Sequence, residues 1–309
     1  MRRMSLFVAL LGVTCAPKDF APSSAVDTLR VLAVQADKPF AAPGEDVKLS
    51  ALVADPLGNG RPLHFAFGTC INPGSGEIQD CVARLGPMRT VPVTDTSAEL
   101  DVTVPAGALV GLQIPIGTVG VVFAVCAGTF APQPRAFGAP IGCVDDKGSL
   151  VSRDGFMWGM KRITVILGVR NGNPSITETK IDVSRNAWEE TSNIPIKACP
   201  PGDVASCPSS LKHAIDVTMD PLSIESYPDP LDLRQARTED VVLFFFASQG
   251  AFGDEVVRPV SADAGAPQTF TTVWVPVAVD PARTVDFWFV LRDDRGGTSF
   301  VHRSATILP

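Results

Sequence analysis

Short runs of alternating apolar and polar residues, separated by turns rich in proline and glycine, are the feature that most constrains this fold. In VKLSALVADPLGNG, Val47, Leu49 and Val53 alternate largely with other side chains, and PLGNG follows. A period of two is the pattern of a strand with one buried face, and proline and glycine favour the backbone angles of turns. Similar runs recur along the chain, with no capped helical periodicity between them. The sequence therefore predicts an all-β fold.

The expected strands fall into two sets, separated by GVRNGNPS at residues 168–175. The first set comprises residues 29–37, 47–53, 63–69, 98–104, 119–127 and 162–168, and the second comprises 176–184, 194–199, 214–219, 240–248, 269–279, 285–294 and 299–308. Glycine, asparagine and proline make the separating segment a natural linker. The PGEDV turn and the strand after it resemble the opening of immunoglobulin-like folds. We expect two tandem immunoglobulin-like β-sandwich domains, residues 28–168 and 174–309, because a chain of 309 residues exceeds the usual size of one core.

The two sets end alike. VGVVFAVC precedes a long loop and KRITVILG, whereas VDFWFVLR precedes DDRGG and SFVHRSATILP. We interpret each pair as the last two strands of a sandwich, with a tight turn at Asp294, Arg295 and Gly296. Trp288 alternates with Phe287 and Phe289, so one of these two faces is expected to be less buried.

The amino terminus has the pattern of a secretory signal peptide at residues 1–14. Arg2 and Arg3 precede an apolar run, SLFVALLGVT, of about ten residues, which spans only ~15 Å as a helix. The small residues before Cys15 resemble the lipobox of bacterial lipoproteins, although Thr14 stands where glycine or alanine is usual. The resemblance implies that Cys15 is diacylated and begins the mature chain. Cleavage beyond Cys15, as in an ordinary secreted protein, is the alternative.

APKDFAPSSAVD follows Cys15 and is rich in proline, alanine and serine, so residues 15–27 are expected to be a flexible tether. Ala16 replaces the aspartate that retains many lipoproteins at the inner membrane. By resemblance, the outer membrane is therefore the expected location, on the periplasmic side or at the cell surface.

Six cysteines remain for disulfides once Cys15 is set aside. They form three couples along the chain, each spanning a loop rich in glycine or proline: Cys70 and Cys81, Cys126 and Cys143, and Cys199 and Cys207. Disulfides persist in exported proteins, and we predict that each couple is bridged. A bridge between Cys70 and Cys126, at an immunoglobulin-type separation, is the rival pairing. The cysteine spacings and the scattered histidines do not fit a zinc site, so no metal is expected.

No motif of catalysis stands out, and we expect no catalytic residue and no cofactor. Ser75 lies between glycines, but G-S-G is not the nucleophile elbow. A formal net charge of −7 without a basic run disfavours nucleic acid as a partner. Three separate histidines remain as candidates: His64, His213 and His302. Four tryptophans would form a glycan platform if exposed: Trp158, Trp188, Trp274 and Trp288. Four acidic pairs near turns suggest calcium or glycosidase chemistry: Asp145–Asp146, Glu189–Glu190, Asp254–Glu255 and Asp293–Asp294.

The opening strands, the short cysteine loops and the closing DFWFVLRDDRGG segment resemble uncharacterised immunoglobulin-like envelope lipoproteins of myxobacteria. The resemblance extends over most of the mature chain and implies no catalytic residue. It implies a non-enzymatic, lipid-anchored envelope protein that presents loops to a protein or glycan partner or serves as an assembly subunit. A secreted carbohydrate-active or peptidase accessory protein, with a calcium or acidic-pair site in its loops, is the alternative.

Overall fold

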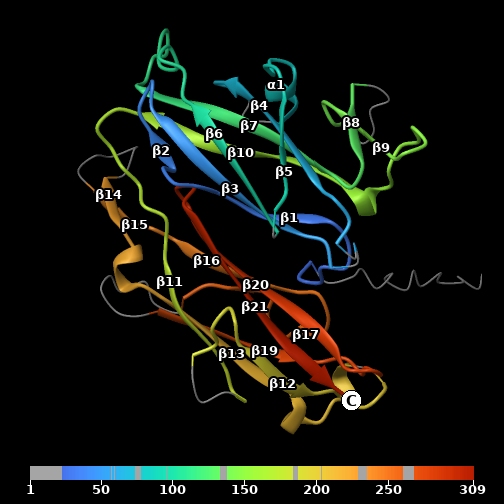
Figure 1. Cartoon of the computed structure of the whole chain (residues 1–309). Helices are drawn as coiled ribbons and strands as arrows, with labels where there is room; N and C mark the ends of the chain where they lie inside the picture. Colours follow the sequence, from blue (N-terminus) through green and yellow to red (C-terminus); the bar gives the residue numbers. More distant parts are fainter. Residues whose placement is uncertain are drawn as a thin grey trace, which may run out of the picture.

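The computed structural model describes residues 23–309, except 57, 59, 74–77, 95, 133–137, 184–186, 203, 229–234 and 260–267. Within these residues the chain is all-β apart from short helical segments, as expected (Figure 1). The predicted signal peptide, Cys15 and residues 16–22 lie outside the described residues.

Two sheets formed by residues 30–166 pack face to face, and we call them the N-terminal sheet pair. One sheet has the order β1-β3-β6 and the other β2-β10-β7-β4-β5. The strands are β1 (Arg30–Ala36), β2 (Phe40–Ala41), β3 (Asp46–Ala54), β4 (His64–Ile71), β5 (Arg89–Pro92), β6 (Ser97–Thr103), β7 (Ile116–Cys126) and β10 (Phe156–Ile166). A small ribbon of β8 (Thr129–Ala131) and β9 (Gly142–Val144), the helix α1 (Ile78–Val82) and a 3-10 turn at Arg153–Gly155 complete this half.

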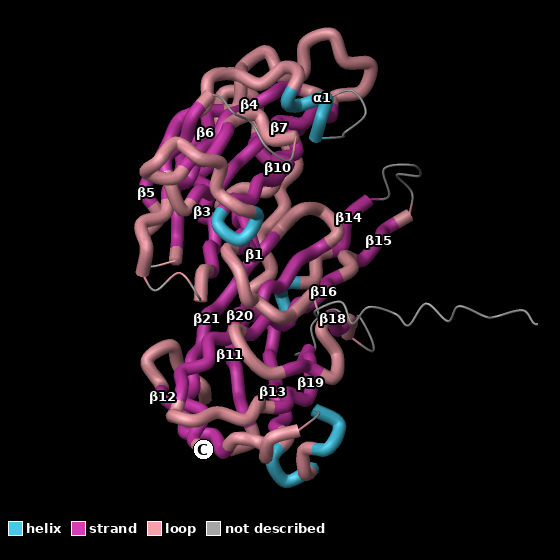
Figure 2. The backbone as a smooth tube through the Cα atoms, turned by 90° about the vertical axis from the view of Figure 1, so that its right-hand side faces the viewer, coloured by secondary structure: helices cyan, strands magenta, loops and turns pink. Residues whose placement is uncertain are grey.

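Residues 176–308 form the C-terminal sheet pair, which lies below the first pair in Figure 1. Its sheets have the orders β11-β13-β19-β17 and β12-β21-β20-β16-β18. The strands are β11 (Ile176–Ile181), β12 (Asn193–Lys197), β13 (His213–Met219), β16 (Val241–Ala247), β17 (Ala251–Phe252), β18 (Val256–Val257), β19 (Gln268–Val275), β20 (Arg283–Asp293) and β21 (Thr298–Leu308). A separate hairpin of β14 (Ser226–Pro228) and β15 (Ala236–Thr238) projects beside the junction of the pairs, and 3-10 turns lie at Val204–Ser206, Ser209–Leu211 and Pro221–Ser223 (Figure 2).

The two pairs repeat one strand order. β1-β3-β6 corresponds to β11-β13-β19, and β2-β10-β7-β4-β5 corresponds to β12-β21-β20-β16-β18. In both, a short edge strand runs parallel to the last long strand, β2 beside β10 and β12 beside β21. The first strand of each also carries an irregularity in register, between Val31 and Ala33 and between Ile176 and Glu178. The similarity expected from the two chain endings therefore extends through the whole topology.

Each pair encloses its own hydrophobic core, built by the inward residues of alternating strands. Leu49, Phe65 and Ile163 are fully buried in the first core, and Phe245, Phe270 and Phe287 are fully buried in the second. The aromatic side chains of the second core meet edge to face, as when Trp274 contacts Phe287 at 4.8 Å between ring centroids. Such contacts add to the stability that burial of apolar area provides.

The three predicted disulfides are present, and two of them cover the outer face of a sheet. Cα atoms lie 5.4 Å apart in Cys70–Cys81, 5.7 Å in Cys126–Cys143 and 5.5 Å in Cys199–Cys207. The first two bridges hold their loops against the outward residues of β7 and β10, among them Val122, Ala124 and Trp158. Because both faces of β7 are covered, its sequence is almost continuously apolar.

The two sheet pairs meet through a third apolar cluster. Leu32, Ala33 and Leu52 of the N-terminal pair pack against Trp288 and Val290 of the C-terminal pair, and all five are at most 4% exposed. The expectation that one face of the Trp288 strand is less buried is therefore wrong, because the N-terminal pair covers it. The run of phenylalanines in β16 is covered on its second face by the same contact.

The residues just before β1, from Ser24 to Val26, are bonded to the C-terminal sheet pair. Val26 is fully buried in the junction cluster, and its N–H donates to the Ala247 carbonyl at 2.9 Å. Ala247 in turn donates to the carbonyl of Ser24 at 3.0 Å, so the segment is held beside the end of β16. Ser24 and Val26 thus bind the C-terminal sheet pair, although both fall within residues 15–27, which were predicted to be a flexible tether.

Candidate functional site: the sheet junction and an apolar loop

The tight turn between β20 and β21 reaches the junction of the two sheet pairs. One oxygen of Asp293, Oδ1, accepts from the backbone N–H groups of Arg295 at 2.8 Å and Gly297 at 2.7 Å. Gly296 has a φ of 96°, which glycine adopts without a steric cost. The tight turn expected at Asp294, Arg295 and Gly296 is therefore confirmed.

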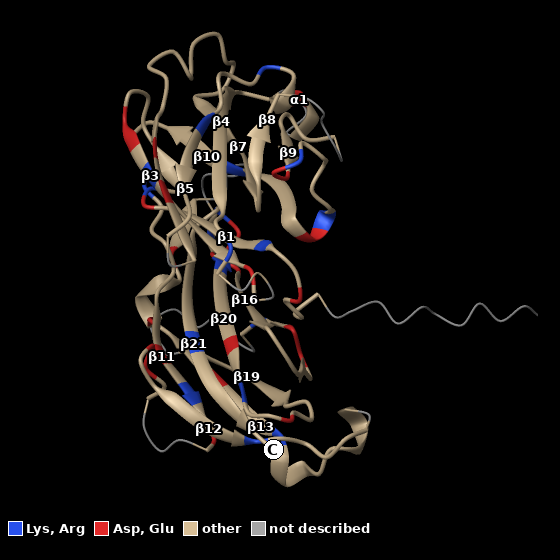
Figure 3. Ribbon diagram, turned by 45° about the vertical axis from the view of Figure 1, so that its right-hand side comes forward, with Lys and Arg blue, Asp and Glu red and all other residues tan. Residues whose placement is uncertain are grey.

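Arg295 is the centre of a polar network at the junction. Its side chain is only 8% exposed, and Nη1 donates to Glu225 at 3.1 Å and to Glu239 at 3.0 Å. Nη2 donates to the carbonyl of Arg170 at 3.2 Å. The guanidinium also lies over the rings of Phe40 at 4.9 Å and Tyr227 at 4.5 Å. One side chain thus joins the linker, the N-terminal pair and the segment around β14 and β15. Basic and acidic residues lie close together at the junction of the sheet pairs, between the labels of β1 and β16 in Figure 3.

Glu239 is the buried carboxylate of this network, with only 2% of the residue exposed. Burial raises its pKa from 4.5 to about 7, and the nearby carboxylates of Asp293 and Glu225 act in the same direction. The N–H of Glu225, which donates to it at 3.0 Å, and Arg295 oppose this rise. The carboxyl group therefore titrates near neutral pH inside the junction.

Polar bonds also fix the linker between the sheet pairs. Arg170 forms two hydrogen bonds to Glu45, at 2.9 and 3.0 Å, and this contact holds the pKa of Glu45 at about 2. Asn173 donates to the carbonyl of Ala36 at 2.7 Å and accepts from the N–H of Thr298 at 2.9 Å. The segment predicted as a linker is thus bonded to both sheet pairs.

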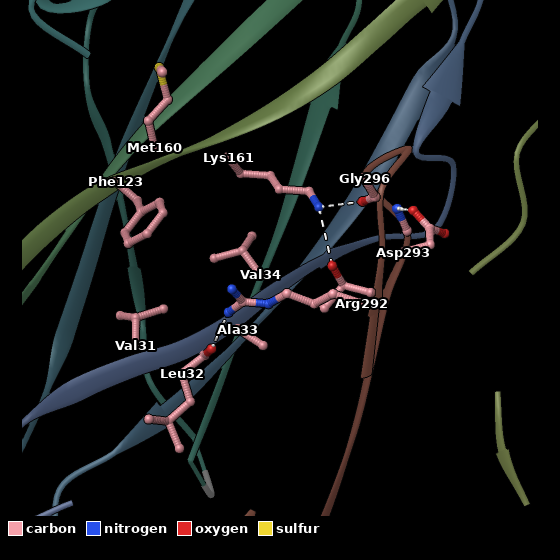
Figure 4. Close-up of a pocket in the computed structure, with 12 residues that line it drawn as sticks. Val31, Leu32, Ala33, Val34, Phe123, Met160, Lys161, Arg292, Asp293 and Gly296 are labelled. Atoms are coloured by element: carbon pink, nitrogen blue, oxygen red, sulfur yellow. Dashed lines mark hydrogen bonds between the residues drawn. The ribbon is translucent and has the colours of Figure 1, made fainter. Parts of the chain in front are cut away.

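A cavity of about 250 Å³ opens beside the turn, between β1, β10 and the β20–β21 hairpin. Lys161 of β10 enters it and donates to the Gly296 carbonyl at 2.7 Å, with Thr298 Oγ1 at 3.5 Å (Figure 4). Burial, together with the smaller influence of the Arg292 charge, lowers the pKa of Lys161 from 10.5 to about 8. Arg292, from the opposite wall, donates to the Leu32 carbonyl at 2.8 Å.

An apolar loop, residues 104–115 between β6 and β7, lies at the top of Figure 1, away from the C-terminal pair. Val110 is 80% exposed and Ile114 is 63% exposed. The chain carries no charged residue from Val102 to Pro134, so nothing in this loop offsets its apolar character. Large exposed aliphatic side chains gathered on one loop are typical of an interaction site.

Asn72, the residue after β4, fixes the base of the apolar loop. Its Nδ2 donates to the Ala108 carbonyl at 2.7 Å, and its Oδ1 accepts from the N–H of Thr118 at 2.7 Å. Asn72 has a φ of 45°, a conformation that asparagine tolerates better than most residues. Ala108 is fully buried, so the loop is anchored while its tip is exposed.

The other residues singled out in the sequence do not come together. Ser75 lies outside the described residues, as does Cys15. His64 is half-buried on β4, His213 binds Asp182 at 2.9 Å and His302 binds Asp286 at 2.9 Å, each in a different strand. In the part of the chain that the structure describes, no three histidine, cysteine or acidic side chains group in a way that suits a metal ion.

One acidic pair and most of the tryptophans have local structural roles. Asp145 accepts from the N–H groups of Lys147 and Ser149 and closes a turn. Trp188, Trp274 and Trp288 are at most 2% exposed, so these three side chains do not form an exposed platform for a glycan. Trp158 is half-buried beneath the disulfide loops.

Sequence reasoning missed Arg295, Glu239, Lys161 and the apolar loop. The first three are single charged residues whose burial depends on contacts between distant strands. The apolar loop could have been found from the sequence, because no charged residue follows Val102 until after Pro134. The strands on either side of the loop are also apolar, so the uncharged run was not recognised as a separate feature.

Comparison with known proteins adds only distant resemblances. No protein-family model and no curated protein matches the chain. Two solved structures resemble it, each at 11% identity over 91% of this chain: red sea bream transglutaminase, with a TM-score of 0.26, and dimeric latent PorU from Porphyromonas gingivalis, with a TM-score of 0.24. The chain covers 31% of the first and 24% of the second. Among the described residues, no helix is long and apolar enough to cross a membrane.

Proposed function

We propose that this chain is a non-enzymatic, lipid-anchored envelope protein that presents the apolar loop to a protein partner. The observation that carries the proposal is the loop itself, with Val110 80% exposed and Ile114 63% exposed above a base fixed by Asn72. Aliphatic side chains favour a protein partner over a glycan, because glycans are commonly bound by exposed aromatic rings and polar groups. The loop is already ordered, which lowers the entropic cost of binding.

The strand order supports two immunoglobulin-like domains, residues 28–168 and 174–309. In the first half, β1, β3 and β6 form one sheet, and the other sheet is built around β4, β7 and β10. In the second half, β11, β13 and β19 form one sheet, and the other is built around β16, β20 and β21. This is the division of an immunoglobulin sandwich, in which strands A, B and E face strands C, F and G. Three disulfides are consistent with export to an oxidising compartment.

Lipid attachment at Cys15 and an outer-membrane location are part of the same proposal. Ser24 and Val26 bind at the junction, so a short tether would hold the protein to the membrane near its middle. Intact mass of the mature protein extracted from membranes tests this. We expect a peptide that begins at Cys15 and carries a diacylglycerol group, whereas an unmodified terminus beyond Cys15 would remove the anchor from the proposal.

A photo-reactive amino acid at position 110 tests the proposed partner surface in the intact envelope. The matched control is position 222, because Leu222 is 82% exposed in the other sheet pair. We expect a discrete protein adduct from position 110 that is absent from position 222, and that Ile114→Asp abolishes. Equal adducts at both positions, or an adduct indifferent to Ile114→Asp, would contradict the proposal.

A further inference from the structure

The cavity at the junction presents two cations without a carboxylate partner. In the described part of the chain, neither Lys161 nor Arg292 forms an ion pair, whereas Arg295 on the same hairpin binds both Glu225 and Glu239. Lys161 donates to uncharged oxygens, and Arg292 donates to a backbone carbonyl and lies over the ring of Phe244 at 4.9 Å. Lys161 is half-buried, and a charged group that is partly withdrawn from water is normally paired. With exposed Arg292 beside it, the cavity is lined by two cations and the single carboxylate of Asp293.

Asp293 also lines the cavity but is already occupied by the hairpin. Its oxygens accept from the N–H groups of Arg295 and Gly297 and from Asn171 Nδ2 at 3.4 Å. The charge of Asp293 raises the pKa of Lys161, but this influence is smaller than that of burial or of the Arg292 charge, both of which lower it. Asp293 thus offsets only one of the two positive charges that line the cavity.

The remaining wall is apolar. Val31, Val34 and Phe123 line the cavity on the side of the N-terminal pair, whereas the Met160 side chain packs against the Cys70–Cys81 bridge on the other face of β10. Its volume of about 250 Å³ corresponds to about eight water molecules. Arg292 is exposed and Lys161 is half-buried, and the two side chains reach the cavity from β20 and β10 respectively (Figure 4).

We propose that this cavity binds a small organic carboxylate, with its acid group between Lys161 and Arg292 and its apolar part against Val31, Val34 and Phe123. Lys161 has three N–H donors and uses two, and the Arg292 guanidinium has five and uses one, so donors remain for the ligand. The bound acid would neutralise the two cations and close the space between the sheet pairs. This site is separate from the apolar loop and does not depend on the lipid anchor.

Benzoate is the test probe, with benzamide as its neutral counterpart and inorganic phosphate as an anion without an apolar part. We expect benzoate to raise the midpoint of thermal unfolding in a saturable way and benzamide and phosphate to have little effect. Lys161→Met should weaken benzoate binding by about tenfold or more. Arg162→Met is the matched control, because Arg162 is the neighbouring cation on the opposite face of β10, and it should bind as the wild type does.

A second measurement needs no variant. Acetylation of the wild-type protein, mapped by mass spectrometry, should be slowed at Lys161 by benzoate but not by benzamide, with exposed Lys48 unchanged in both. Equal effects of benzoate and benzamide, equal binding of phosphate, or unchanged benzoate binding in a folded Lys161→Met variant would each overturn the proposal. An absence of any benzoate effect would overturn it as well.

Discussion

Arg295 is almost enclosed, and its guanidinium is the common partner of two carboxylates from outside its own hairpin. Its desolvation is offset by bonds to Glu225, Glu239 and the Arg170 carbonyl, and by two aromatic rings. Removal of one member of such a buried group leaves the other charge without compensation, which costs more than the pair itself contributes. The residue therefore connects local chemistry to the placement of the sheet pairs.

We expect Arg295→Met to lower the free energy of unfolding by about 3–5 kcal/mol, because Glu239 would remain buried without its cation. Urea denaturation measures the change. Arg258→Met is the control, since Arg258 binds Asp240 on the surface, where both side chains are more than half exposed, and such a pair contributes about 0–1 kcal/mol. Equal losses in the two variants would show that Arg295 does not support the junction.

Glu239 gives the junction a dependence on pH. Burial raises its pKa from 4.5 to about 7, so between these values the folded chain holds a proton that the unfolded chain has released. The stability that this proton provides is fully present below the unfolded pKa and is lost as the pH rises through the folded pKa. We expect wild-type stability to fall between about pH 5 and 7 relative to Glu239→Gln, in urea titrations at several pH values. Parallel curves for the two proteins would contradict the raised pKa.

At the scale of single elements, β7 shows how a disulfide loop constrains the strand beneath it. A Cβ atom at Gly120 would lie 2.8 Å from each sulfur of Cys70–Cys81 and 3.1 Å from Met160 Sδ, distances too short for carbon and sulfur. Gly120 has no positive φ, so its need for glycine is steric rather than conformational. The loop can cover the sheet closely because this strand position lacks a side chain.

We therefore expect Gly120→Ala to destabilise the protein by about 1–3 kcal/mol, the usual cost of overpacking a core. Gly107→Ala is the control, since the nearest atom to its added Cβ would be Val110 Cγ2 at 3.9 Å. Chemical denaturation under oxidising conditions measures both. After removal of the bridge by Cys70→Ala and Cys81→Ala, the penalty of Gly120→Ala should shrink, and an unchanged penalty would indicate another source of strain.

The elements themselves could be predicted well because their information is local. Alternation and turn residues located most long strands, and the spacing of cysteines gave all three pairings. Short strands such as β2, β17 and β18 were missed, because two residues carry no periodic signal and form only by pairing with a longer neighbour. The bulge in β1 could not be predicted from alternation either, because it turns two consecutive residues, Leu32 and Ala33, toward the junction. The candidate site at the cavity was missed because it depends on contacts between distant segments. Lys161 and Arg292 come together only after both sheet pairs have formed.

At the scale of the whole molecule, the two sheet pairs share an interface that resembles a small core. Trp288, Val290 and Leu32 are nearly inaccessible there, and Val26 adds a contact from the segment before the first strand. The Arg295 network and the bonds of Asn173 lie at the same junction. A junction that is both apolar and hydrogen-bonded favours one fixed arrangement over free motion about the linker. We therefore expect the wild type to unfold in a single calorimetric transition.

Leu32→Asp tests this coupling, because Leu32 is 4% exposed and faces the junction rather than the core of its own sheet pair. The new carboxylate would be buried if the pairs stayed docked, whereas it would reach water if they separated. Both cores would remain intact, so we expect calorimetry to resolve two transitions and small-angle scattering to show a broader distribution of dimensions. Leu222→Asp, at a side chain that is 82% exposed, should leave one transition and unchanged dimensions. If Leu32→Asp also melted in one transition with wild-type dimensions, the junction would not be what holds the sheet pairs together.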